Sequence, residues 1–297
     1  MQAELIATVP CQCTLGEGIL WDARLGAFLW TDIHACALHT YHLESGEHTV
    51  LPLPRRLASF ALTPDSDTLL AAFDDRIATL HRVSGTVADL IVPPLLSGVR
   101  FNDGRTDPEG RFWVGTMVED AAAAGAENRG ELFSLDPSGA LSVHRGGIAI
   151  SNGIAFSPDG TRMYFADSPT RRVIHRPTSA HYGAGQADTS FLTTDPGAFP
   201  DGAVTSADGR YWSANWGAGL IRVTHADGTD AGRLPVPASQ PSCCAFGGRD
   251  LSILAVTSAR EDLTPAALAA EPDAGNVFLY QTDAAGLPSV PYAGPLN

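Results

Sequence analysis

A sequence unit that recurs every 40–50 residues or so limits the possible folds of this chain more than any other feature. Each copy runs through an apolar strand, turns at a Gly- or Asp-bearing pair and returns as an aromatic-rich strand. Pro158-Asp159-Gly160 is one such turn, and Gly or Asp there tolerates the positive φ of a tight hairpin. The six copies open at Glu17, Ala58, Asn102, Asn152, Asp201 and Ser242, which lie 41, 44, 50, 49 and 41 residues apart.

A second hairpin follows in most copies, for example Leu38–Leu43 toward Glu47–Leu51. Four short strands per repeat are typical of a propeller blade, so we predict an all-β fold, a six-bladed β-propeller with four-stranded antiparallel blades. The N-terminal strand Glu4–Val9 is expected to pair beside Asn276–Tyr280, which closes the ring and removes two exposed edges. Residues 1–297 are expected to form this single propeller domain.

Charge and composition exclude several partners. The net charge is −14 and every basic residue is an arginine, which disfavours nucleic acid and anionic membranes and excludes lysine-based Schiff-base or P-loop chemistry. The first residues lack a signal-peptide pattern and no apolar run reaches the roughly 18 residues of a membrane span, so a soluble, cytoplasmic protein is expected. The five cysteines form no paired motif and are expected to be free thiols. None of the nine histidines opens a repeat, and each is expected at the surface or in packing.

Equivalent positions of a ring of blades converge near its axis, so Glu17, Asn102, Asn152 and Asp201 are predicted to share one site. Two close carboxylates repel each other unless a cation lies between them. Carboxylate, carboxamide and water oxygens suit Ca²⁺, Mg²⁺ or Mn²⁺, and so few protein ligands leave coordination positions open for catalysis. The alternative is that these residues only form turns and cap loose backbone N–H groups. Four equivalent polar positions favour the metal site.

The same segments resemble the senescence-marker-protein/gluconolactonase family, which includes regucalcin, bacterial aldonolactonases and luciferin-regenerating enzymes. The matching motifs, in order over essentially the whole chain, are Leu15-Gly-Glu17-Gly, Arg100-Phe-Asn102-Asp103-Gly104, Asp107-Pro-x-Gly110-Arg-x-Trp-x-Gly115-Thr116-Met117, Ser151-Asn152-Gly153, Phe156-Ser-Pro-Asp-Gly160, Pro200-Asp201-Gly202 and Cys244-x-Phe246-Gly247-Gly248.

This resemblance implies a divalent metal bound by Glu17, Asn152 and Asp201, whose identity among Ca²⁺, Mg²⁺, Mn²⁺, Zn²⁺ and Fe²⁺ stays open. It also implies that Asn102 lies close to the metal and contacts substrate, with Arg100 beside it.

The resemblance further implies that Glu119 or Asp120 helps to bind a sugar. Both lie at the start of an Ala-rich loop, residues 118–129, which has the composition of a flexible lid.

With this resemblance, the site residues predict a metal-dependent sugar lactonase that opens an aldono-lactone (glucono-, xylono-, arabinono- or galactono-lactone) to the acid in carbohydrate oxidation. Asp201 is the candidate general base, and Phe199 and Trp216 are candidate pocket walls. A Gly-x-Ser-x-Gly elbow is missing from the sequence, which argues against a serine esterase. Two alternatives are a propeller hydrolase of other lactones or organophosphates and a calcium-binding regulatory protein of regucalcin type. The pairing of Arg100 with Asn102 favours the sugar lactonase, because a pure calcium binder needs no sugar-orienting guanidinium.

Overall fold

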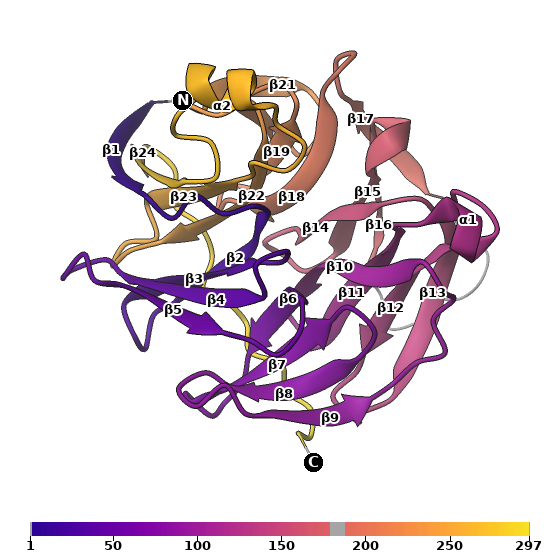
Figure 1. Cartoon of the computed structure of the whole chain (residues 1–297). Coiled ribbons are helices and arrows are strands. Elements are labelled where there is room, and N and C mark those ends of the chain that lie inside the picture. Colours follow the sequence, from indigo (N-terminus) through magenta and orange to yellow (C-terminus); the bar gives the residue numbers. More distant parts are fainter. Residues whose placement is uncertain (1, 179–187, 297) are drawn as a thin grey trace.

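The computed structural model describes residues 2–178 and 188–296, so His181 lies outside the described part of the chain. Six four-stranded antiparallel sheets surround a central channel, and Figure 1 looks roughly along it. The predicted six-bladed β-propeller is therefore confirmed.

The strands follow one another from the channel outward within each sheet. The first two sheets consist of β2 (Gly16–Asp22), β3 (Ala27–Asp32), β4 (Ala37–His42) and β5 (His48–Pro52), and of β6 (Leu57–Leu62), β7 (Thr68–Phe73), β8 (Ile77–His81) and β9 (Val87–Ile91). The third and fourth consist of β10 (Val99–Thr106), β11 (Phe112–Val118), β12 (Gly130–Leu135) and β13 (Leu141–Ile148), and of β14 (Ser151–Phe156), β15 (Arg162–Asp167), β16 (Arg172–Pro177) and β17 (Thr189–Thr193). The fifth and sixth consist of β18 (Phe199–Thr205), β19 (Tyr211–Trp216), β20 (Leu220–Thr224) and β21 (Asp230–Pro235), and of β22 (Pro241–Gly247), β23 (Ile253–Ser258), β24 (Val277–Thr282) and β1 (Ala3–Val9).

The ring closes as the sequence predicts. Strand β1 pairs antiparallel with β24, and Val9 lies opposite Val277. The last sheet thus combines the N-terminal strand with three strands from residues 241–282. This pairing covers one edge of β24 and one edge of β1.

The hydrophobic core lies between neighbouring blades. Leu20 and Leu29 of the first sheet pack with Phe60, Leu69 and Phe73 of the second, and all five are buried. Burial of such a side chain is worth about 1.5–3 kcal/mol. Alternate apolar residues of the inner strands therefore hold adjacent blades at a fixed angle around the channel.

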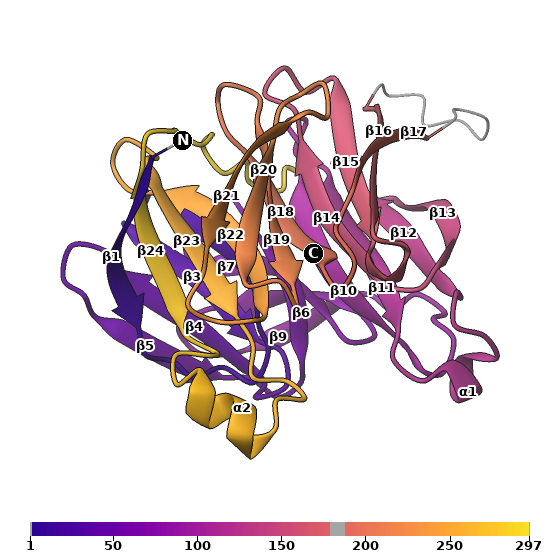
Figure 2. The same cartoon turned by 90° about the horizontal axis from the view of Figure 1, so that it is seen from above.

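In the part of the chain that the structure describes, helices occur only in loops. They are η1 (Ser168–Thr170), a single 3₁₀ turn, and the short helices α1 (Ala121–Ala124) and α2 (Pro265–Ala270). Figure 2 shows α1 and α2 projecting from the same face of the ring. None of the helices in the described ranges is long and apolar enough to cross a membrane.

Candidate metal and substrate site

A cavity of about 450 Å³ opens at one mouth of the channel. Six of the residues predicted for the site line it: Glu17, Arg100, Asn102, Glu119, Asn152 and Asp201. They come from the innermost strands of four blades and from the loop after β11. The structure therefore brings together side chains that lie as far as 184 residues apart, from 17 to 201, in the sequence.

A shift in strand register directs these side chains into the cavity. Each of the strands β2, β10, β14 and β18 has an irregularity in its pairing with the next strand. The register shifts lie between residues 17 and 20, 101 and 104, 152 and 155, and 200 and 203, so each one begins at the site residue or at the residue before it. A β-bulge bends its strand and re-aims a side chain. The irregularity also explains why a glycine follows Glu17 and Asn152. Gly18 (φ +61°) and Gly153 (φ +66°) have a left-handed backbone conformation that residues with a side chain rarely adopt.

Glu17 and Asp201 are both buried, and each accepts a backbone hydrogen bond from the glycine that follows it (3.0 Å to Gly18 N and 3.0 Å to Gly202 N). Burial, reinforced by the charge of Asp103, raises the pKa of Glu17 to about 8. Burial, together with the charge of Glu17, raises the pKa of Asp201 well above its usual value. Among the described residues no arginine or histidine forms an ion pair with either carboxylate, and the charge of Arg100 opposes the rise in the pKa of Glu17 without cancelling it.

The donor set around this charge fits a hard divalent cation. Besides the two carboxylates it includes the carboxamide oxygens of Asn152 and Asn102, and hard cations prefer such all-oxygen ligation. Clusters of three or more His, Cys, Asp or Glu side chains suited to a metal do not occur in residues 2–178 and 188–296. A site here therefore depends on two carboxylates supplemented by carboxamide and solvent oxygens.

A chain of hydrogen bonds fixes the two asparagines. Arg100 Nη1 donates to Asn102 Oδ1 (2.9 Å), and Asn102 Nδ2 donates to Asn152 Oδ1 (3.1 Å). Asn152 Nδ2 donates in turn to Ser168 Oγ (2.9 Å), which donates to the carbonyl of Pro200 (2.7 Å). Every member is buried, so the amide orientations are determined by their neighbours.

Glu119 and Asp120, both predicted to bind sugar, have different surroundings. Glu119 lines the cavity and accepts hydrogen bonds from Arg100 Nε (3.1 Å) and Arg56 Nη1 (2.7 Å). Asp120 is outside the lining and caps α1, where it accepts the N–H groups of Ala122 and Ala123. The Ala-rich loop therefore contains a capped helical turn, and its first carboxylate is the one that faces the cavity.

The rim contains residues that the sequence analysis missed as well as two that it named. Phe199 and Trp216, expected as walls, both line the cavity. Ser168 and Glu261 also line it, and Glu261 Oε1 contacts the Nε2 of His34 at 2.6 Å. In each blade the innermost strand begins, and the second strand ends, at the same mouth of the channel. The residues just after each second strand could therefore have been predicted to lie near the site.

Comparison with known proteins shows similarity over nearly the whole chain. A family model described as the SMP-30/Gluconolactonase/LRE-like region matches residues 15–260. An L-arabinolactonase from Azospirillum brasilense is 38% identical, over 99% of this chain and 96% of its own length. A pentonolactonase from Haloferax volcanii is 35% identical, over 86% of this chain and 84% of its own length. The crystal structure of a calcium-binding protein, regucalcin, from Agrobacterium tumefaciens aligns with a TM-score of 0.90 at 33% identity, and the alignment covers 97% of each chain.

Proposed function

The chain belongs to the SMP-30/gluconolactonase/LRE-like family, and on this premise we propose that it is a metal-dependent sugar lactonase that hydrolyses an aldono-lactone to the aldonic acid. The observation that carries the proposal is the meeting of Glu17, Asn152 and Asp201 in one cavity beside Arg100 and Asn102. Glu17, Asn152 and Asp201 are the proposed metal ligands. The names of the two lactonase relatives favour a five-carbon lactone as the substrate.

The metal ion, when bound, supplies Lewis-acid polarisation of the lactone carbonyl and a positive charge for the oxygen that becomes negative during hydrolysis. Asp201 Oδ1 is engaged by the N–H of Gly202, which leaves Oδ2 as the proposed acceptor of a proton from the attacking water. Water adds to the carbonyl carbon, the ring carbon–oxygen bond breaks, and the ring oxygen takes up a proton. The product is the open-chain acid.

Arg100 and Asn102 are proposed to orient the sugar. Arg100 is 4% exposed, and its guanidinium is held by Glu119 and by the carbonyl of Phe101 (2.9 Å). A guanidinium fixed in this way loses little side-chain entropy when it binds a hydroxyl or ring oxygen. A protein that only binds calcium has no use for this arrangement, which is why we favour catalysis over a purely calcium-binding role.

A pH-stat assay tests the proposal. EDTA-treated protein is given arabinono-, xylono-, galactono- and glucono-lactone, first without metal and then with Ca²⁺, Mg²⁺, Mn²⁺, Zn²⁺ or Fe²⁺, and spontaneous hydrolysis is subtracted. We expect turnover that EDTA abolishes and metal restores, fastest on a five-carbon lactone. Lack of metal-dependent turnover on every lactone would refute the proposal and leave the calcium-binding alternative.

Two variants separate the proposed roles of the carboxylates. Asp201→Asn is expected to nearly abolish turnover while it weakens metal binding less than Glu17→Gln does, because the amide keeps an oxygen donor but cannot take the proton. Calorimetric metal titration is measured beside the rates of both variants. An active Asp201→Asn enzyme would exclude Asp201 as the general base.

A further inference from the structure

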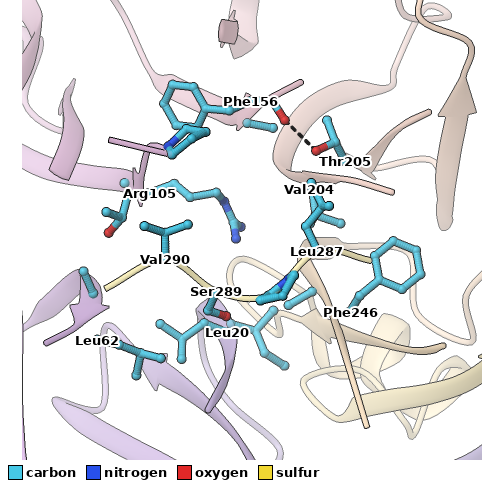
Figure 3. Close-up of a pocket in the computed structure, with 18 of the residues that line it drawn as sticks. Leu20, Leu62, Arg105, Phe156, Val204, Thr205, Phe246, Leu287, Ser289 and Val290 are labelled. Atoms are coloured by element: carbon cyan, nitrogen blue, oxygen red, sulfur yellow. Dashed lines mark hydrogen bonds between the residues drawn. The ribbon is translucent and has the colours of Figure 1, made fainter. Parts of the chain in front are cut away.

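A second cavity, of about 350 Å³, lies at the opposite end of the channel (Figure 3). The innermost strands that present the metal and substrate site continue into it, so Leu20, Arg105, Phe156 and Thr205 line the second cavity further along the same strands. Its volume is within the range of about 300–1,000 Å³ that is usual for small-molecule sites. Nothing in the proposed hydrolysis uses this cavity.

The wall of the second cavity is apolar in character. Phe60, Leu62 and Phe246 are buried parts of it. Hydroxyl groups in the wall are mostly engaged within the protein: Thr205 Oγ1 donates to the carbonyl of Phe156 (2.6 Å) and Ser289 Oγ donates to that of Trp21 (2.8 Å). A sugar would find few free hydrogen-bonding partners here.

The hydroxyl of Ser157 is engaged as well, since it donates to Asp159 Oδ1 (2.6 Å). Among the described residues that line the second cavity, Arg105 is the one that carries a charge. Figure 3 shows its guanidinium directed into the cavity, between Phe156 and Val290.

The guanidinium of Arg105 has much unused hydrogen-bonding capacity. Its Nε donates to the carbonyl of Ile154 (3.2 Å), and one terminal nitrogen lies 4.0 Å from Cys243 Sγ, a distance too long for a strong bond. Burial raises the pKa of Asp103 and the charge of Arg105 opposes that rise, but no ion pair within 4.0 Å joins Arg105 to a carboxylate in the described ranges. A cation in an apolar cavity without an ion-paired anion favours an anionic ligand.

A crossing segment, residues 285–293, covers the second cavity from outside. The carbonyl of Ala285 accepts the N–H of Ala207 (2.8 Å), and the N–H of Tyr292 donates to Leu62 (2.8 Å). Between these points Leu287 and Val290 line the cavity, and each is 37% exposed. The segment therefore forms an apolar cover that is fixed at both ends and partly accessible in the middle.

From these observations we infer that the second cavity binds a monocarboxylate with an apolar tail, of the medium-chain fatty-acid class, whose carboxylate pairs with Arg105. The apolar walls and the crossing segment accommodate the tail. A guanidinium can bind a carboxylate through two parallel hydrogen bonds. Inorganic phosphate and sugar phosphates fit poorly, because a single arginine faces a dianion inside a protein of net charge −14.

Isothermal titration calorimetry with sodium decanoate tests the inference on the full chain. Arg105→Met keeps the length of the side chain without its charge, Val290→Phe narrows the cavity from the crossing segment, and Arg249→Met is the matched control, because Arg249 is exposed and outside the cavity. Decan-1-ol supplies the tail alone and acetate the carboxylate alone. Circular dichroism and thermal unfolding verify that each variant is folded.

We expect decanoate to bind the wild type and Arg249→Met equally. Affinity should fall at least tenfold in Arg105→Met and clearly in Val290→Phe, and decanol and acetate should bind at least tenfold more weakly than decanoate. The inference is overturned if decanoate does not bind at 1 mM, if Arg105→Met binds it as tightly as the wild type, or if decanol binds equally well. A lactonase without decanoate binding refutes only this inference, and decanoate binding without lactonase activity refutes only the proposed function.

Discussion

Ser168 offers a sharp test of how the site is held together. Its hydroxyl accepts the hydrogen bond of Asn152 Nδ2 and donates to the carbonyl of Pro200, and it is 6% exposed. Ser168→Ala removes both bonds with little change in volume. Asn152 then keeps only its contact with Asn102, on the other side of the amide.

The expected loss follows from this geometry. A buried donor left without its partner costs about 1–3 kcal/mol. Groups that orient metal ligands typically change metal affinity by about 10–100-fold when they are removed, which corresponds to about 1.4–2.8 kcal/mol. We therefore expect Ser168→Ala to weaken metal binding by about 10–100-fold, while Ser168→Thr, which keeps the hydroxyl, stays close to the wild type.

The assay is calorimetric titration of Ca²⁺ and Mn²⁺ into EDTA-treated protein, beside urea unfolding without metal. Ser206→Ala is the matched control, because Ser206 is also buried and accepts a hydrogen bond from Trp212 Nε1 (3.1 Å) at the other end of a neighbouring blade. The control should lose unfolding free energy and keep metal affinity. Wild-type metal affinity in Ser168→Ala would show that the orientation of Asn152 does not depend on this hydroxyl.

Three further predictions follow from other contacts. Arg100→Met should reduce kcat/KM by about 10–100-fold, chiefly through KM, because it removes a charge-assisted donor, and steady-state kinetics with an unchanged KM would contradict its substrate role. Asp22→Asn should lower the free energy of unfolding in urea by about 3–5 kcal/mol, because Arg82, whose side chain is 6% exposed, then keeps a buried charge without its carboxylate partner. The control is Asp208→Asn at an exposed ion pair, where the expected loss is below about 1 kcal/mol. Burial, aided by the neighbouring His48, lowers the pKa of His39 from 6.5 to about 4, so the unfolded chain takes up the proton first and stability falls as the pH drops through this window. This effect contributes about 2 kcal/mol between pH 7 and pH 5, and His39→Leu should remove that share of the pH dependence in urea titrations whereas exposed His225→Leu should not.

The fold was predictable because each blade repeats the same local signals. An apolar strand, a tight turn and a return strand recur in every copy, and the copies that open at Ala58 and Ser242 match the template less fully than the other four. Local agreement of this kind defines the blade without long-range information. The predicted hairpin Leu38–Leu43 toward Glu47–Leu51 corresponds to β4 and β5 with shifts of one residue at each end. Once the number of blades is known, the equivalence of Glu17 and Asp201 places both at one mouth.

The remaining parts of the site depend on loops that the repeat does not specify. Ser168 and Glu261 follow the second strands of their blades, where loop length and conformation vary from copy to copy. Asp120 carries the same charge as Glu119, and only the start of α1 decides which of the two faces the cavity. The crossing segment has no strand or helix pattern, so its position beneath the channel could not be predicted from periodicity.

The register shift of the inner strands occurs in all six blades, including β6 and β22, where Ala58 and Ser242 take the equivalent position. Neither of these two side chains reaches the cavity: Ala58 packs in a hydrophobic cluster, and the hydroxyl of Ser242 donates to the carbonyl of Gly16. The same backbone irregularity therefore presents a polar side chain to the cavity in four blades and serves packing between blades in the other two. The ligand set is decided by the residue placed at the irregularity and not by the irregularity itself.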